Sequence, residues 1–326
     1  MTKQTRSLLA SAAVLAMAAA PALADDRDGW PSSLTVGTAS QGGVYFVYGN
    51  GMAAFLSEEL GISASGEVTG GPVQNVTLVQ MGEHDIGLVT LGPMFEAWIG
   101  ESELAPGLEH TDVRALFPMY ETPFQGIAMC NQNIESVGDL AGKRVSVGPA
   151  GGTPGTYWPR IFDALDVDAN VSFAGAADAA SQLQDGLIDA FVFAAGLPIA
   201  AFSQLSAESN VCTFAFNEEE HAAVLDAFPE VSDFTIPAGT YTVQDDDQAS
   251  VAMWNFAVVR ADMPDSLAYE ITRLVMENND RMMQIHAAAA ATLPENFGNN
   301  SFLPFHPGAV RWFEENGFEI DPDLRG

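Results

Sequence analysis

Short apolar runs alternate along this chain with longer stretches in which apolar residues recur every three or four positions. The short runs cover residues 86–90, 113–119, 124–130 and 250–260 and predict buried strands. The longer stretches predict helices that turn one apolar face inward. Two such faces are formed by Tyr45, Tyr48, Met52, Phe55 and Leu56, and by Leu267, Ile271, Leu274, Val275 and Met282. This alternation favours an α/β fold built on mostly parallel sheets.

Two stretches, residues 34–46 and 145–157, follow the same plan of a strand, a glycine-rich turn and the start of a helix. Glycine has no Cβ atom, so the backbone N–H groups of such a turn can approach a ligand closely. The helix that follows adds unpaired N–H groups and the positive end of its dipole. Each stretch therefore predicts an anion site that needs neither lysine nor arginine.

The similarity continues into the units that follow these two turns. Four residues recur at identical spacing, namely Gln80, Gly82, Asp85 and Gly92 in the first unit and Gln184, Gly186, Asp189 and Gly196 in the second. An internal repeat of this kind predicts two related structural units. We expect two α/β lobes with a ligand held between them.

The order of the segments predicts where the chain passes between the lobes. A length of 326 residues suggests about two domains. Residues 120–123 are the expected first crossing, and the strand at 250–260 marks the return. The predicted lobe I comprises residues 25–122 and 246–326, and lobe II residues 123–245. Two crossing segments would form a hinge.

The composition narrows the possible partners. The chain is 48% hydrophobic and carries a formal net charge of −31. Nucleic-acid binding is disfavoured at such a charge, and we interpret the acidity as a solvated surface. We expect a monomer.

The first 24 residues have the features of a secretory signal. Lys3 and Arg6 precede a short apolar run, and Ala22-Leu23-Ala24 fits a cleavage site. Cleavage after Ala24 would leave 10 basic and 43 acidic residues, a formal charge of −33. We therefore expect an exported, periplasmic protein.

The chain has two cysteines, Cys130 and Cys212. An even pair in an oxidising compartment favours a disulfide, with two buried thiols as the alternative. The five histidines are scattered at 84, 110, 221, 286 and 306 and lack the spacing of metal ligands, and Asp245–Asp247 is interpreted as a solvated turn. We expect no metal and no cofactor.

Six motifs in a fixed order give the chain a family resemblance. They lie at residues 36–45, 69–75, 80–85, 142–156, 236–241 and 303–309. Together they resemble the TAXI family of solute receptors, the extracytoplasmic subunits of TRAP transporters. The resemblance implies a two-lobed, type II periplasmic-binding-protein fold that closes on a small carboxylate, such as a glutamate-like molecule, a 2-oxo acid or a dicarboxylate. It also implies a membrane permease as partner and no catalytic residues.

Carried over by position, the resemblance implies a ligand site shared by the two lobes. Lobe I would contribute Ser40, Gly42, Gly43, Tyr45, Thr69, Thr90, Leu91 and Gly92. Lobe II would contribute Gly151, Gly152, Thr153, Gly155, Thr156, Phe193 and Gly196. This chain differs from the typical sequence of the TAXI family at two places near the expected pocket. Residues 46–51 have a less common sequence, and Pro154 stands where a small polar residue is usual.

Some of these residues have a structural interpretation as well. Ser40 and Thr156 fit helix caps as well as ligand contacts. Tyr45 and Phe193 fit the core as well as a pocket wall. We expect Trp158 to pack in the core and Arg160 to lie at the surface, with a solute contact as the alternative for each.

Two other functions share this fold. A ligand sensor that docks on a signalling receptor has the same sequence features as a transport receptor. An enzyme would need a nucleophile beside a base, or paired carboxylates in the cleft, and the glycine-rich turns offer neither.

Overall fold

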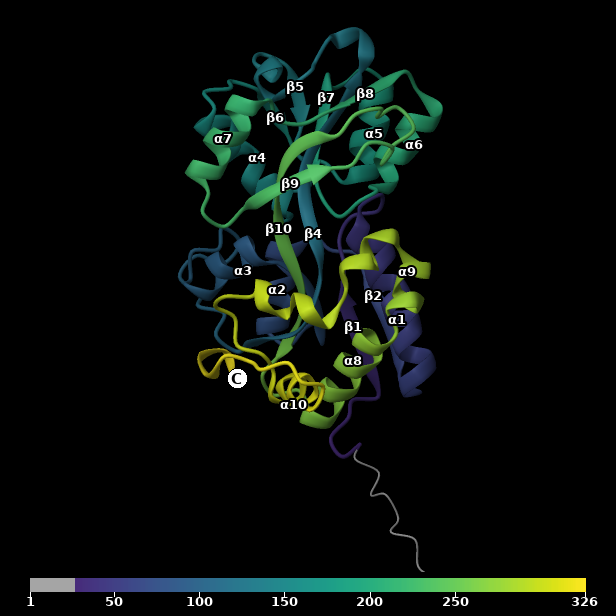
Figure 1. Cartoon of the computed structure of the whole chain (residues 1–326), viewed down its shortest axis with the longest axis vertical. Coiled ribbons are helices and arrows are strands. Elements are labelled where there is room, and N and C mark those ends of the chain that lie inside the picture. Colours follow the sequence, from purple (N-terminus) through teal and green to yellow (C-terminus); the bar gives the residue numbers. More distant parts are fainter. Residues whose placement is uncertain (1–26) are drawn as a thin grey trace, which may run out of the picture.

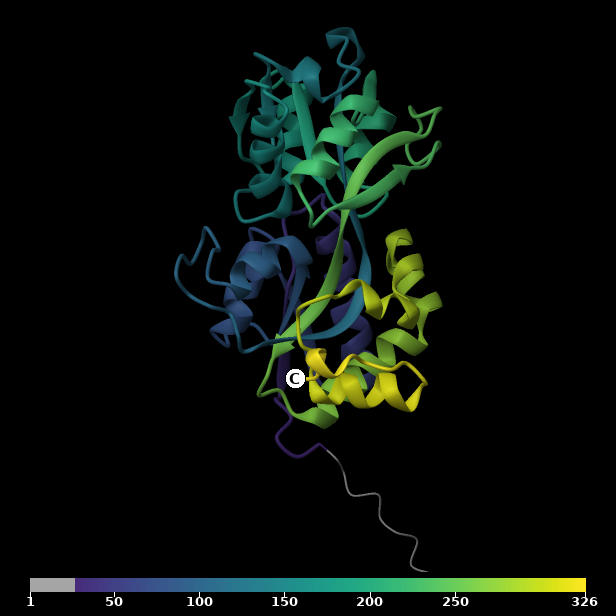
Figure 2. The same ribbon diagram turned by 60° about the vertical axis from the view of Figure 1, so that its left-hand side comes forward.

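The structure is a computed structural model and describes residues 27–326, so the predicted leader lies outside the described residues. Two lobes are stacked along the long axis of the molecule, and strands β4 (Val113–Met129) and β10 (Gln248–Arg260) run between them (Figure 1). The lower lobe in this view is called lobe I and the upper one lobe II. Figure 2 shows the narrow waist that these strands cross.

Lobe I is a sheet covered by helices. Its remaining strands are β1 (Ser33–Gly37), β2 (Ser63–Glu67) and β3 (Ile86–Thr90), and its helices are α1 (Val44–Leu60), α2 (Pro72–Gln80), α3 (Leu91–Trp98), α8 (Asp265–Glu277), α9 (Asn279–Ile285) and α10 (Pro307–Glu315). The strand order is β2-β1-β3-β10-β4. The pairs β1–β2 and β1–β3 are parallel, whereas β10 runs antiparallel to both of its neighbours in this order.

Lobe II repeats this arrangement on a smaller scale. Its strands are β5 (Arg144–Ser146), β6 (Asn170–Ser172), β7 (Ala190–Ala194), β8 (Val211–Phe214) and β9 (Ser232–Ile236), and its helices are α4 (Thr153–Ala164), α5 (Ala176–Gln184), α6 (Ala200–Glu208) and α7 (Glu218–Ala227). The upper part of β4 pairs antiparallel with β7 and β8, and β5 pairs parallel with β6 and β7. The predicted α/β class is thus confirmed, although each sheet is mixed, because β10 runs antiparallel to its neighbours in lobe I and β4 does so in lobe II.

The sequence predicts two separate strands at residues 113–119 and 124–130, but the structure has one continuous strand, β4, over this region. It continues through residues 120–123, because the fixed φ of Pro123 is compatible with extended backbone. Its pairing with β10 is irregular instead: the register shifts between Trp254 and Phe256 and again between Ala257 and Val258, and β4 has one extra residue at each shift. Asn255 lies at the first shift, and its Nδ2 atom donates to the carbonyl of Tyr120 at 2.6 Å. The side chain thus takes the place of a ladder hydrogen bond.

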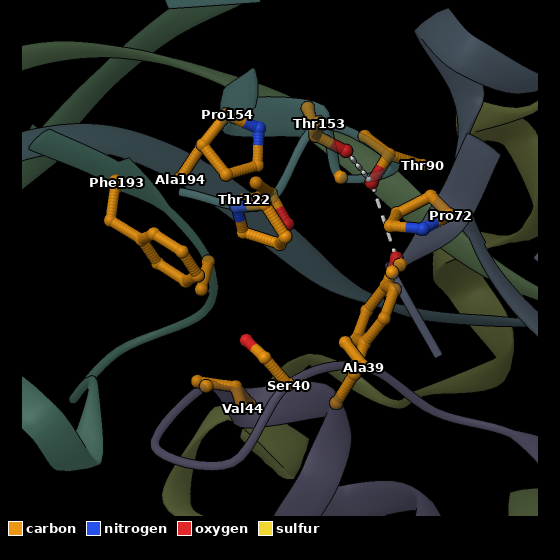
Figure 3. Close-up of a pocket in the computed structure, with 17 residues that line it drawn as sticks. Ala39, Ser40, Val44, Pro72, Thr90, Thr122, Thr153, Pro154, Phe193 and Ala194 are labelled. Carbon is orange, nitrogen blue, oxygen red and sulfur yellow. Dashed lines mark hydrogen bonds between the residues drawn. The ribbon is translucent and has the colours of Figure 1, made fainter. Parts of the chain in front are cut away.

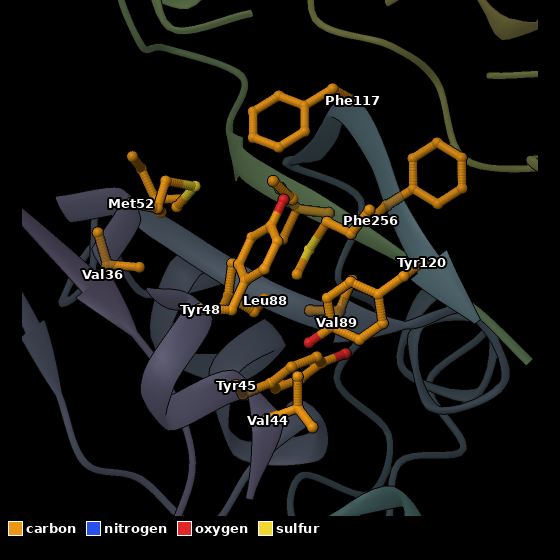
Figure 4. Packing of buried hydrophobic residues seen from close by; sticks show 14 of the residues in the cluster. Val36, Val44, Tyr45, Tyr48, Met52, Leu88, Val89, Phe117, Tyr120 and Phe256 are labelled. Atoms are coloured by element: carbon orange, nitrogen blue, oxygen red, sulfur yellow. The ribbon is translucent and has the colours of Figure 1, made fainter. Parts of the chain in front are cut away.

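Several local predictions hold in detail. Strand β3 has the predicted bounds, and the helical face of Tyr45, Tyr48 and Met52 is buried in the core of lobe I (Figure 4). Strands β6 and β9 have no counterpart in the prediction, because neither carries an apolar run and each is fixed by pairing with a neighbour.

The two cysteines form a disulfide between the end of β4 and β8. Cys130 and Cys212 have Cα atoms 5.0 Å apart and close a loop with a sequence separation of 82 residues. Among residues 27–326, no helix combines the length and the apolar character that crossing a membrane requires.

Candidate functional site

A small cavity lies at the seam between the lobes, beside the crossing strands. Its volume is about 30 Å³. Seventeen residues line it, and Figure 3 shows the Ser40 hydroxyl, the Phe193 ring and Pro72 around the central space. From lobe I and β4 come Ala39, Ser40, Gly43, Val44, Tyr45, Gly70, Gly71, Pro72, Thr90 and Thr122; from lobe II come Pro149, Gly152, Thr153, Pro154, Phe193, Ala194 and Ala195.

Four helices begin at this cavity. Gly43, Gly71, Thr90 and Gly152 are the N-cap residues of α1, α2, α3 and α4, and all four line the cavity. None of them makes a side-chain capping bond, and no acidic residue lies in the first turn of these helices. Four positive dipole ends therefore meet at one small volume. In α2 the first N–H groups are not free, because Pro72 has none and that of Val73 donates to Gly151 O.

A buried polar network forms one wall of the cavity. The Oδ1 atom of Asn255 accepts from the hydroxyl of Tyr45 at 2.6 Å and from that of Thr90 at 2.9 Å. The Thr153 hydroxyl, from lobe II, donates to that of Thr90 at 2.8 Å. Burial raises the pKa of Tyr45 well above its usual value, so the phenol keeps its proton and acts as a donor. Thr122 also bonds to Asn255.

Glycines let the two lobes approach each other at backbone distance. Gly71 has φ of 123°, and a Cβ atom there would lie 2.9 Å from the Cα atom of Gly152. Beside this contact, the N–H of Val73 in α2 donates to the carbonyl of Gly151 at 3.1 Å. Side chains at these positions would keep the lobes apart.

A second set of contacts joins the turn before α1 in lobe I to α5 and α6 of lobe II. Ala177 N donates to Gln41 O at 3.1 Å, and Ala201 N donates to Gly42 O at the same distance. The Ser40 hydroxyl accepts from the N–H of Ala176 at 3.2 Å. The lobes thus touch on both sides of the cavity, and the structure is in a closed arrangement.

Seven of the fifteen residues proposed as ligand contacts line the cavity. These are Ser40, Gly43, Tyr45, Thr90, Gly152, Thr153 and Phe193. Among the described lining residues the other eight do not appear: Gly42, Thr69, Leu91, Gly92, Gly151, Gly155, Thr156 and Gly196.

Most of those eight residues have structural contacts around the cavity or between the lobes. Gly42 and Gly151 accept the interlobe bonds described above. Thr69 bonds to Asn75 and orders the turn before α2. A Cβ atom on Gly155 would lie 2.2 Å from Pro149 O, and one on Gly196 would lie 2.7 Å from the Tyr120 ring. Of the rest, Leu91 and Gly92 border a separate groove and Thr156 is buried in α4.

Two polar lining or wall residues were missed by the sequence analysis, Thr122 and Asn255. An amide within the apolar strand 250–260 is the signal that could have indicated Asn255. Trp158 packs in the core as predicted and donates from Nε1 to Phe193 O at 3.1 Å. Arg160 contacts two carboxylates of lobe I rather than the cavity.

The chemistry of the lining is uniform. None of the seventeen lining residues carries a charge; they offer hydroxyls, backbone groups and apolar surface. Within residues 27–326, no group of three or more histidine, cysteine, aspartate or glutamate residues is placed to hold a metal ion.

Two α/β lobes joined by crossing strands, with a cavity at their seam, define the type II periplasmic solute-binding fold. The chain belongs to the NMT1-like family, whose model matches residues 36–317. Solved structures share this architecture.

Three solved structures illustrate the likeness. A structure described as a periplasmic transporter is 13% identical, with 88% of this chain and 93% of that one covered and a TM-score of 0.56. A histidine-bound ABC uptake transporter binding protein from Streptococcus pneumoniae is 14% identical, with coverage of 78% and 90% and a TM-score of 0.49. A methylphosphonate-bound protein from Prochlorococcus marinus is 14% identical, with coverage of 81% and 92% and a TM-score of 0.49. At these identities the likeness concerns the fold alone.

Proposed function

We propose that this protein is the extracytoplasmic solute receptor of a TRAP-type transporter and that its solute is a small carboxylate. The lobes close over the acid, and closure presents a composite surface to the membrane permease. The observation that supports a carboxylate as the solute is that four helix N-termini meet at one cavity, which no acidic side chain lines.

Hydrogen bonds alone can supply enough free energy to bind a carboxylate at such a site, without a cationic side chain. Hydrogen bonds from N–H groups to a carboxylate contribute about 1.5–3 kcal/mol each in a dry cleft. Three or four of them, after the costs of association and closure, correspond to micromolar or tighter binding. The Ser40 hydroxyl stands at the same cavity and can add a further donor, because it accepts from Ala176 N and its own proton stays available.

The size of the cavity favours a compact solute. A volume of about 30 Å³ in the closed arrangement compares with about 10–15 Å³ for a single water in this measure. The cavity as it stands thus has room for about two or three water-sized groups, which favours a small acid over a sugar or a peptide. The apolar walls, formed by Val44, Pro72, Pro154 and Phe193, suit the carbon chain of such an acid.

The test is a thermal-shift and calorimetric panel of 2-oxo acids, dicarboxylates and glutamate, each paired with its amide or methyl ester. An acid at a hundredfold excess over its Kd stabilises the folded state by about 2.7 kcal/mol, which raises Tm by several degrees. The neutral partner should give no shift. Equal shifts from an acid and its ester would contradict the anion site.

The assignment to a TRAP transporter rests on the family resemblance of the six motifs. It is tested by asking whether a multi-span permease is encoded next to this chain, reconstituting that permease in liposomes and measuring uptake of the radiolabelled acid. Uptake should require the receptor and an ion gradient. Uptake that depends on ATP instead, or a soluble signalling receptor as the binding partner, would contradict the assignment.

A further inference from the structure

An ionic cluster outside the cavity joins the two lobes. Arg160 of α4, in lobe II, pairs through Nη1 with Glu96 of α3, in lobe I. Its Nη2 atom lies 3.3 Å from the second oxygen of Glu96 and 3.1 Å from Glu103. The guanidinium thus holds Glu96 through both carboxylate oxygens, a geometry that is stronger and more directional than a single contact.

The cluster is partly shielded from water. The Glu96 side chain is 15% exposed and that of Arg160 is 35% exposed. The Tyr157 hydroxyl donates to the same Glu96 oxygen at 3.1 Å, and the guanidinium lies over the Tyr157 ring, 5.2 Å from its centre. Burial alone would lower the pKa of Arg160, but the hydrogen bond to Glu96 raises it above its usual value. Separating the lobes would leave the Glu96 carboxylate without these partners.

Other arginine–carboxylate pairs of the described chain lie within one lobe. Arg144 pairs with Asp189 inside lobe II, and Arg273 pairs with Glu270 and Glu277 along α8. Movement of the lobes leaves such pairs intact. The contacts of the Arg160 cluster, in contrast, form when the lobes close and break when they separate.

The two helices that carry the cluster also reach the cavity. Helix α3 begins at Thr90 and α4 begins at Gly152, both lining residues, while Glu96 and Arg160 lie further along the same helices. A solute that draws the two N-termini together therefore also brings the ionic partners into contact. The ionic cluster and the solute site are therefore both completed when the lobes close.

We propose that Arg160, with Glu96, Glu103 and Tyr157, forms a latch that holds the closed arrangement and sets solute affinity without touching the solute. This inference rests on the proposed function for its biological meaning, but the latch acts on the lobes themselves. The apparent Kd of a receptor scales inversely with the fraction of molecules in the binding-competent form. Arg160 is accordingly a positioning residue, and its loss should raise Kd roughly tenfold.

The latch is tested by small-angle X-ray scattering on the full-length mature protein, which reports how far the lobes are apart. Wild type is compared with Arg160→Gln, Glu96→Gln and the double variant, without added solute and with about 10 mM sodium 2-oxoglutarate as the probe. Arg160→Gln should increase the radius of gyration in at least one of these conditions. Because the double variant removes the same pair, it should be no more extended than either single variant.

Salt provides a second measurement. Raising NaCl from about 50 mM to about 500 mM screens the partly exposed cluster and should extend the wild type but not the Arg160→Gln variant. Arg273→Gln is the matched control, because it removes an arginine pair of similar exposure within lobe I. It should leave both the radius of gyration and the salt response unchanged.

The results of these experiments distinguish a failure of the latch from a failure of the proposed function. A wild-type protein that is already extended in both conditions, or an Arg160→Gln variant as compact as wild type, would overturn the latch. Neither result bears on whether an acid binds, which the thermal-shift panel decides. If no acid in the panel binds while Arg160→Gln extends the protein, the carboxylate proposal is wrong and the latch stands.

Discussion

Replacing Gly152 by valine should abolish solute binding and leave the fold intact. Gly152 caps α4 and lines the cavity, and its φ of −108° is accessible to any residue, so the backbone itself does not require glycine. A Cβ atom there would lie 3.3 Å from Gly70 O of lobe I and 3.2 Å from the Pro149 ring. The branched side chain would therefore obstruct closure and cover the N–H groups at the start of α4. Losing two or more such hydrogen bonds weakens binding by at least about a hundredfold.

The measurement is calorimetric titration with the acid that gives the largest thermal shift, together with circular dichroism and Tm. Gly43→Val is a second variant at the opposite turn, where a Cβ atom would meet the Phe193 ring at 3.6 Å and the methyl groups would enter the cavity. Gly298→Val is the control, because a Cβ atom there has nothing within 4 Å. It should bind as wild type does. Unchanged affinity in both Gly43→Val and Gly152→Val would refute the site.

Removing the disulfide should lower stability strongly without affecting binding. The bond between Cys130 and Cys212 closes a loop with a sequence separation of 82 residues. In the chain-entropy account a loop of this length corresponds to about 4 kcal/mol of stability. For a protein of this size that loss lowers Tm by roughly 6 °C. The bond lies at the end of β4, in residues that do not line the cavity, so the Kd of the folded protein should stay the same.

The double variant Cys130→Ala/Cys212→Ala tests this without leaving a free thiol. Denaturant unfolding gives its free energy of unfolding, and calorimetry below its Tm gives its affinity. A reducing agent should lower the Tm of the wild type toward that of the variant and leave the variant unaffected. Equal stability of variant and wild type would show that the loop is held by other contacts.

The two glycine-rich turns could be predicted from the sequence because they occur twice in the same local pattern. Strand, turn and helix start are contiguous in each copy, so neighbouring residues carry the whole signal. Gly43 and Gly152 therefore line the cavity as the repeat suggested. The disulfide followed from cysteine count and compartment alone.

Features that depend on distant pairing could not be predicted in this way. Asn255 reaches the cavity wall only because the β4–β10 pairing shifts register beside it. The contact between Gly71 and Gly152 and the pair of Arg160 with Glu96 depend on how the two lobes meet. Such contacts join residues more than sixty positions apart, and no local pattern of hydrophobic and polar residues encodes them.

A crystal structure of the protein with the acid selected by the panel tests the central claim most directly. The account predicts that the carboxylate lies in the cavity between Phe193 and Pro72, with its oxygens within about 3.2 Å of backbone N–H groups at the start of α1 and α4. A solute bound elsewhere, or one held in the cavity with its carboxylate turned away from these helix starts, would contradict it.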